Sequence, residues 1–155
     1  DSLKTSGPII FITAAGSVLG QVIVEAGFVQ YIQQNASAFS SIGIFFPFVV
    51  AAIIKTSQGS STVAMTTTAG MMGLYFSDAS LMAALGMTTP LDAVLVVMAI
   101  GAGAMTVSHA NDSYFWVVTN FGGLTPQNGY KTQTATTLIM GTVSIITLFI
   151  ISLFI

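Results

Sequence analysis

The chain is a succession of long apolar runs that are interrupted by two short polar segments. Residues 56–62 read Thr-Ser-Gln-Gly-Ser-Ser-Thr, and we call them the tip segment. Residues 108–113 read Ser-His-Ala-Asn-Asp-Ser, and we call them the linker segment. Because the flanking sequence is apolar on both sides, the ionisable groups of the linker segment, His109 and Asp112, are costly there and indicate a functional site. The pattern predicts that the two segments face each other and hold a small polar solute.

Two apolar runs are long enough to be complete membrane-spanning helices. Residues 8–27 would span about 30 Å as a helix, and residues 132–155 form a second, charge-free span. The first of these carries a polar side chain at every fourth position, which places Thr13, Ser17, Gln21 and Glu25 on one helical face. That face either lines the solute path or packs against the rest of the protein. Residues 28–41 are too polar to span and are expected at the membrane interface.

Other apolar runs are too short to cross a bilayer on their own. Residues 42–54 and 63–76 flank the tip segment, and we predict that residues 42–76 form a re-entrant hairpin. Residues 91–120 are predicted to be one span that is broken at the linker segment. The glycines, proline and asparagine that follow, over residues 121–131, indicate an aqueous turn-rich loop. The predicted fold is an all-α polytopic membrane protein with a re-entrant helical hairpin and a broken transmembrane helix.

Composition supports a membrane protein. Hydrophobic residues make up 54% of the 155 residues and charged residues only 5%, whereas soluble domains carry about 25% charged residues. The alternative is an unusually apolar soluble domain. With no arginine and a net charge of -2, a nucleic-acid partner is not expected. Cysteine is absent, which excludes disulfides and thiolate metal sites, and we expect neither a metal nor a cofactor.

The tip segment has the groups needed to bind a polyhydroxylated acid. Gly59 lets the backbone turn and approach a ligand, and the N-terminal end of the following half-helix attracts an anion. Hydroxyls and an amide can pair with the hydroxyls and carboxylate of such a solute. Alternatively, Ser60 to Thr62 only cap the helix. The predicted substrate-binding residues are Lys55, Gln58, Gly59, Ser60, Ser61, Thr62, Asn111 and Ser113.

Three ionisable residues have open roles. Lys55 either neutralises the substrate carboxylate, extends to the interface, or forms a structural ion pair with Asp112. Asp112 and His109 are the candidates for proton coupling, because a histidine or a desolvated carboxyl group can titrate near neutral pH. The alternative is that Asp112 is an N-cap with His109 bonded nearby. Ser108 with His109 and Asp112 also supplies the residue types of a hydrolase, although such close spacing rarely gives triad geometry.

Two motifs resemble the C-terminal part of the gluconate permease family, which are proton-coupled symporters of the ion transporter superfamily. The first is Gln58-Gly59-Ser60-Ser61-Thr62-Val63-Ala64. The second begins at Gly101-Ala102-Gly103 and continues through the linker segment to Tyr114-Phe115-Trp116. The resemblance covers most of the chain. Family members often carry arginine at the position of Lys55. A lysine ammonium is a point charge, whereas an arginine guanidinium offers a planar pair of donors.

The resemblance implies a multi-pass carrier in the bacterial inner membrane that takes up gluconate or a related sugar acid with a proton. It also implies two inverted repeats, of which residues 1–155 would be the second, so this piece should not transport without the first. The expected partners are a small organic acid, a proton, the lipid bilayer, the N-terminal repeat and further copies in a homo-oligomer. Alternatives are a carrier of another small carboxylate, such as a hydroxy acid or D-amino acid, a membrane-embedded hydrolase, and a channel.

Overall fold

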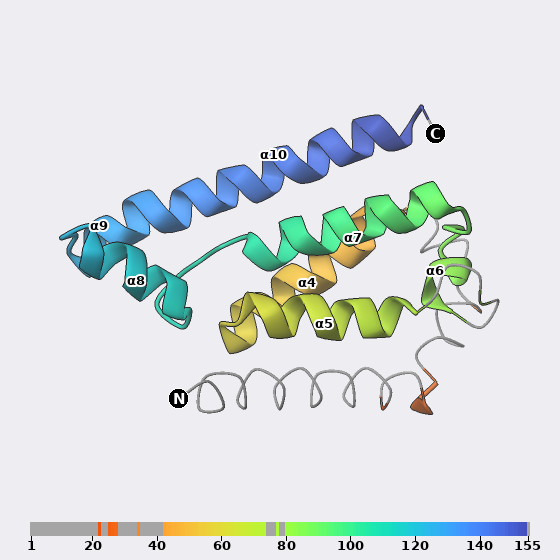
Figure 1. Cartoon of the computed structure of the whole chain (residues 1–155), viewed down its shortest axis with the longest axis horizontal. Helices are drawn as coiled ribbons and strands as arrows, with labels where there is room; N and C mark the ends of the chain where they lie inside the picture. Colours follow the sequence, from red (N-terminus) through yellow and green to blue (C-terminus); the bar gives the residue numbers. More distant parts are fainter. Residues whose placement is uncertain are drawn as a thin grey trace, which may run out of the picture.

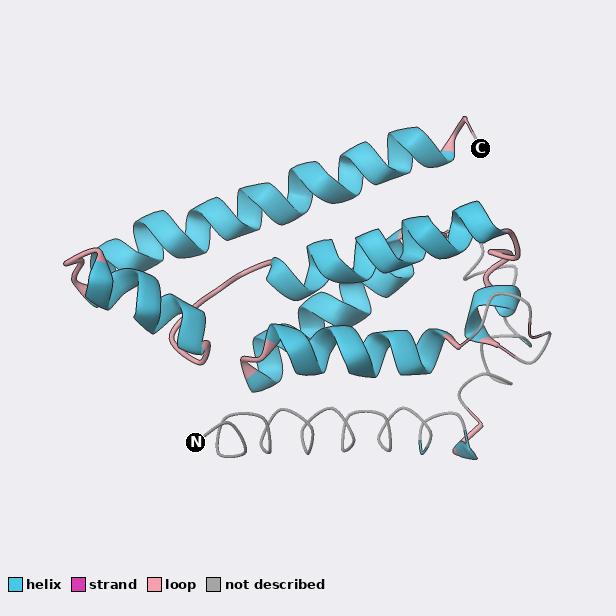
Figure 2. Cartoon of the chain, viewed as in Figure 1, coloured by secondary structure: helices cyan, strands magenta, loops and turns pink. Residues whose placement is uncertain are grey.

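The described part of the chain is entirely helical. The computed structural model describes residues 22, 25–27, 34, 42–73, 77 and 80–154. All the regular elements in these ranges are helices (Figure 2). The all-α prediction is therefore confirmed for this part of the chain. The predicted span at 8–27 and the predicted interfacial segment at 28–41 lie almost wholly outside the described residues.

Helices α4 (Phe45–Gln58) and α5 (Ser61–Met72) form a hairpin around the tip segment. Gly59 ends α4 with a φ of +80°, a left-handed conformation that glycine adopts without a steric penalty. Ser60 then caps α5, its hydroxyl accepting a hydrogen bond of 3.3 Å from the N–H of Val63. A two-residue turn thus reverses the chain (Figure 1).

Helix α7 (Pro90–Met105) packs against this hairpin, and the short helix α6 (Leu81–Ala84) precedes it. Thr89 and Asp92 form a capping box at the start of α7, where Pro90 occupies a position whose N–H would be unpaired anyway. Gly103 allows α7 to approach the backbone of Phe48, which a Cβ at this position would meet. The core lies between these helices and includes Ala51, Ala64, Met72, Leu81, Leu95, Val96, Ala99, Ile100, Ala104, Ile145 and Leu148.

After α7 the chain leaves the helical bundle through the linker segment and continues as α8 (Ser113–Phe121) at one end of the molecule (Figure 1). Three segments then continue as one long helix, namely α9 (Pro126–Gly129), a π-helical turn (Tyr130–Thr134) and α10 (Ala135–Ser152). In Figure 1 this helix runs along the whole upper side of the molecule and covers α7. It begins several residues before the predicted start at 132, because Thr125 acts as N-cap and Pro126 fits the first turn.

Residues 126–152 are the one helix in the described ranges that is long and apolar enough to cross a membrane. Only 22% of its most apolar 18-residue stretch is buried inside the structure. Exposed side chains along it include Leu138, Ile139, Met140, Val143, Ile146 and Ile150. Helices α4 and α7 are apolar but shorter. An apolar exposed surface of this kind fits a lipid or protein environment rather than water.

Two buried threonines on α5 differ from the chain's other helical threonines. The hydroxyls of Thr119, Thr142 and Thr147 each donate to the carbonyl four residues earlier. Thr67 and Thr68 are fully buried, and within the described ranges their hydroxyls have no hydrogen-bond partner. Such groups are rare in folded proteins because desolvating a hydroxyl without a partner costs free energy.

Candidate functional site

The tip segment and the linker segment meet, although about 50 residues separate them in the sequence. Lys55, one residue before the tip segment, lies 2.6 Å from Asp112 in the linker segment, measured from Nζ to Oδ2. The two side chains are only 1% and 6% exposed. A buried ion pair of this kind requires that both charges stay together, since removing one leaves the other uncompensated. Of the roles left open for Lys55, the structure favours the ion pair with Asp112.

Main-chain contacts bring the two segments closer still. A Cβ at Gly59 would collide with the carbonyl group of Asn111, so only glycine fits between the tip and the linker. The side-chain amide of Asn111 donates a short hydrogen bond to the carbonyl oxygen of Thr56. The predicted juxtaposition of the two polar segments is therefore present in the structure.

The Asp112 carboxylate is the centre of the hydrogen-bond network. Its Oδ1 accepts from the backbone N–H of Tyr114 at 3.0 Å, which makes Asp112 the N-cap of α8. Its Oδ2 accepts from the Ser108 hydroxyl at 2.6 Å, in addition to contacting Lys55. Lys55 also donates to the carbonyl oxygen of Gly59 at 3.2 Å. The carboxylate thus both caps α8 and pairs with Lys55, two roles that the sequence analysis had left open.

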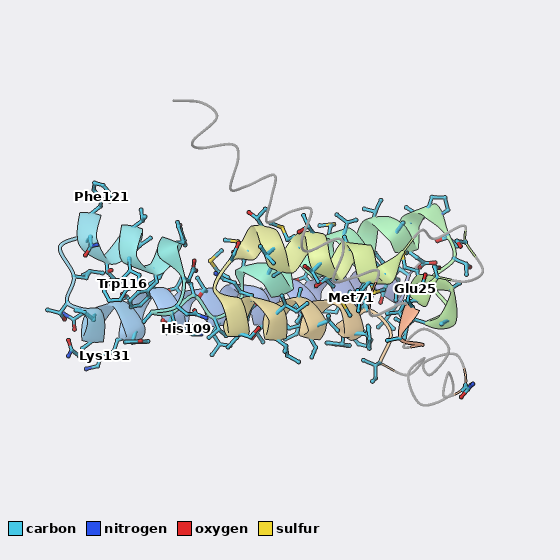
Figure 3. All side chains as sticks on the ribbon, turned by 90° about the horizontal axis from the view of Figure 1, so that it is seen from below. Glu25, Met71, His109, Trp116, Phe121 and Lys131 are labelled. Carbon is cyan, nitrogen blue, oxygen red and sulfur yellow. The ribbon has the colours of Figure 1, made fainter. Side chains whose placement is uncertain are left out.

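The other predicted site residues surround this pair unevenly. Ser60 and Ser61 are half-buried near the start of α5, while Thr62 is exposed. The side chains of Gln58 and Ser113 lie outside the described part of the structure. His109 is half-buried, and its carbonyl oxygen accepts from the N–H of Asp112 at 2.8 Å. It lies where the α8 end of the molecule joins the helical bundle (Figure 3).

The geometry argues against the hydrolase alternative. In a serine hydrolase triad the serine hydroxyl bonds to histidine, and the carboxylate bonds to the other side of that histidine. Here the Ser108 hydroxyl donates directly to Asp112. That carboxylate is also neutralised by Lys55. Such an arrangement leaves Ser108 without a base to activate it.

Three residues of the last long helix, all near the linker, were missed by the sequence analysis. Thr134 and Thr137 bond to the backbone of Ser108, and Gly141 packs against Thr106. Thr134, Thr137 and Gly141 follow one another at intervals of three and four residues, which places them on one face of the last long helix. That spacing of small and hydroxyl residues in an otherwise apolar helix was the only available signal.

Two apolar grooves lie beside the network rather than within it. One, of about 420 Å³, is lined by α4 residues from Phe48 to Ser57 and ends at the tip segment. The other, of about 470 Å³, lies between α7 and α10 and is lined mainly by small and methionine side chains. Neither has the polar lining expected for a sugar acid, so the polar network is the better candidate for substrate contact.

Sequence comparison places these features in a known family context. Residues 1–154 match the profile of the GntP family permeases. The chain is 35% identical over 140 residues to the inner membrane permease YgbN of Escherichia coli, covering 90% of the chain and 29% of that protein. It is 30% identical over 152 residues to a gluconate permease of Pseudomonas aeruginosa, covering 98% of the chain and 32% of that protein.

A third relative is named for a different sugar acid. The chain is 32% identical over 134 residues to the Gnt-II system L-idonate transporter of Escherichia coli, covering 86% of the chain and 28% of that protein. The chain therefore spans about a third of the length of the curated relatives it matches. These names are those of permeases and transporters, not of enzymes. No solved structure matches the chain.

Proposed function

The chain belongs to the GntP permease family, and we propose that the complete protein takes up gluconate or a related sugar acid together with a proton. Transport would take place across the bacterial inner membrane, in line with the similarity to the inner membrane permease YgbN. The observation that carries the proposal is the buried Lys55–Asp112 pair at the meeting point of two polar segments. A buried acid and base beside helix ends are the groups that a proton-coupled anion carrier needs.

The proposed architecture has both polar segments inside the membrane. In this arrangement α4 and α5 form a re-entrant hairpin, and α7 with α8 form a broken transmembrane helix. Residues 1–155 would be the C-terminal repeat of the permease, with spans at 8–27 and 132–155. Irregular backbone at membrane depth is tolerated where it is buried in protein or lines a cavity, and the burial of Lys55 and Asp112 is consistent with this placement.

The proposed substrate site is formed by the helix ends around the pair. The N-terminal ends of α5 and α8 carry partial positive charge, which favours a carboxylate. Hydroxyls and amides of the tip and linker segments would pair with the sugar hydroxyls. We assign substrate contact to Lys55, Gln58, Gly59, Ser60, Ser61, Thr62, Asn111 and Ser113, and proton coupling to Asp112 with His109 as a second group.

The ion pair suggests how proton and anion binding are coupled. While Asp112 is ionised, it neutralises Lys55, and a substrate carboxylate gains little by approaching. Once Asp112 takes up a proton, the Lys55 charge loses its partner, and a buried unpaired charge is strongly unfavourable. A substrate carboxylate can then replace Asp112 as the partner of Lys55. In this scheme proton uptake is required for tight anion binding, and the loaded site carries no additional net charge.

Uptake by the complete protein in sealed vesicles tests the proposal. We expect saturable accumulation of labelled gluconate that depends on an inward proton gradient and is lost with a protonophore. L-Idonate and other sugar acids should compete, while neutral sugars should not. Conductance without saturation would indicate a channel instead, and no uptake of any sugar acid would contradict the proposal. Preference for a short hydroxy acid or a D-amino acid would redirect the substrate class.

Replacing Ser60 and Ser61 together by alanine should weaken substrate affinity. Each lost hydroxyl removes about 0.5–1.5 kcal/mol of hydrogen bonding, so the half-saturation concentration should rise roughly tenfold or more. Concentration dependence of uptake measures this, with membrane expression measured in parallel. The exposed Thr142, whose hydroxyl bonds within its own helix, provides a control as Thr142→Val. An unchanged half-saturation concentration in the double variant would reduce both serines to helix capping.

A further inference from the structure

Two threonines of the last long helix, Thr134 and Thr137, form hydrogen bonds to the backbone of Ser108. Ser108 lies between α7 and α8, so its backbone N–H and carbonyl are not paired within a helix of their own. Its N–H donates to the hydroxyl oxygen of Thr137 at 2.9 Å. Its carbonyl oxygen accepts from the hydroxyl of Thr134 at 2.6 Å. The hydroxyl of Thr137 in turn donates to the carbonyl of Thr134 at 3.1 Å, so the Thr137 hydroxyl is oriented by its own helix.

The contact continues one turn further along α10. A Cβ at Gly141 would overlap the hydroxyl oxygen of Thr106, so α10 lies directly against the end of α7. Between Thr106 and Ser108, Val107 has a φ of +58°, which a β-branched residue rarely adopts. A strained residue persists only where its surroundings fix it, and here its two neighbours are held by α10. Helix α10 thus contacts the residues on both sides of Val107, namely Thr106 and Ser108.

The π-helical turn gives α10 the rotation that these contacts need. Gly129, before the turn, packs on Phe115 and Thr119 of α8, while Thr137, after it, reaches Ser108. Eight residues of regular α-helix would leave these two positions about 80° apart around the axis. The wider turn at 130–134 takes up an additional residue and brings the two contacts closer to one face. The same helix can therefore touch α8 and the linker at once.

We propose that Thr137 and Thr134 are positioning residues, which act through Ser108 to set the geometry of the Lys55–Asp112 pair. The Ser108 hydroxyl donates to the same carboxylate oxygen that Lys55 contacts, so a displaced Ser108 changes the environment of that oxygen. The ionisable groups around Asp112 are Lys55 on α4, His109 in the linker segment and Tyr114 on α8. The face of α10 that reaches the linker adds only hydroxyls and Gly141. The transport consequence rests on the proposed function, whereas the structural coupling does not.

Proton-dependent uptake by the complete protein provides the first test. Thr137→Val removes the acceptor of the Ser108 N–H with little change in shape, so Ser108 should no longer stay fixed on Asp112. We expect about a tenfold fall in the maximal uptake rate and a higher pH of half-maximal uptake, because the carboxylate loses a donor that favours its ionised form. Thr137→Ser retains the hydroxyl and should restore both. Thr142→Val, an exposed position on the same helix, should match the wild type in both.

A double-mutant cycle tests the coupling without any transport. Thermal denaturation midpoints are compared for the purified wild type, Thr137→Val, Asp112→Asn and the double variant. If Thr137 acts on Asp112, the loss from Thr137→Val should be clearly smaller in the Asp112→Asn background. Additive losses, or a Thr137→Val variant with the pH profile of the wild type, would overturn the inference. Coupling in the cycle without sugar acid uptake by the wild type would instead contradict only the proposed function.

Discussion

Replacing Asp112 by asparagine in the complete protein is expected to abolish proton-driven accumulation while leaving exchange of substrate for substrate measurable. Asparagine cannot take up the coupled proton, but it retains an oxygen that can cap α8. For an anion that enters with one proton, each pH unit of gradient supplies about 1.4 kcal/mol, or a tenfold accumulation. The variant should therefore equilibrate its substrate without concentrating it. Accumulation and counterflow are measured on the same vesicles.

The charge of Lys55 complicates this variant and supplies its control. Asp112→Asn leaves a buried ammonium group without its carboxylate, which costs about 3–5 kcal/mol of stability. Adding Lys55→Met removes that unpaired charge, so the double variant should regain thermal stability. It should still fail to accumulate substrate, because both groups of the proposed coupling step are absent. Normal accumulation in either variant would remove Asp112 from the coupling role.

Replacing Gly59 by alanine should have a similarly large effect, through the backbone. At a φ of +80° an alanine is strained by about 1–2 kcal/mol, and its Cβ would collide with the carbonyl group of Asn111. The two nearest contacts of this Cβ are main-chain atoms of Asn111, which cannot move without separating the two polar segments. We expect loss of uptake and a marked fall in the thermal denaturation midpoint of the complete protein.

Gly86 allows the strain to be separated from the collision. It has a φ of +78°, and no atom of the described residues lies within 4 Å of the position that its Cβ would take. Gly86→Ala should therefore lower the stability of the protein by the conformational penalty alone and retain uptake. If Gly59→Ala behaved like Gly86→Ala, close contact between the tip and linker segments would not matter for transport.

The helices and their interruptions were largely predictable, whereas the role of α10 was not. Threonines occur throughout the final helix, and those at 142 and 147 bond only to their own backbone. The spacing of Thr134, Thr137 and Gly141 places them on one helical face, but the local sequence does not show that this face is the one that meets the linker. The start of this helix was also predicted too late, since the proline and glycines at 122–129 were interpreted as a loop. Pro126 after a threonine is equally a helix start.

The sequence by itself determined that the described chain is apolar and helical and that two polar segments interrupt it. These properties follow from local composition, because the lengths of apolar runs and the positions of glycine and hydroxyl residues act over a few neighbouring residues. Only the tertiary structure decided that Lys55 pairs with Asp112 and that Ser108 is held from α10. Those contacts join residues 57, 29 and 26 positions apart, and they depend on how the helices pack, which local pattern does not encode.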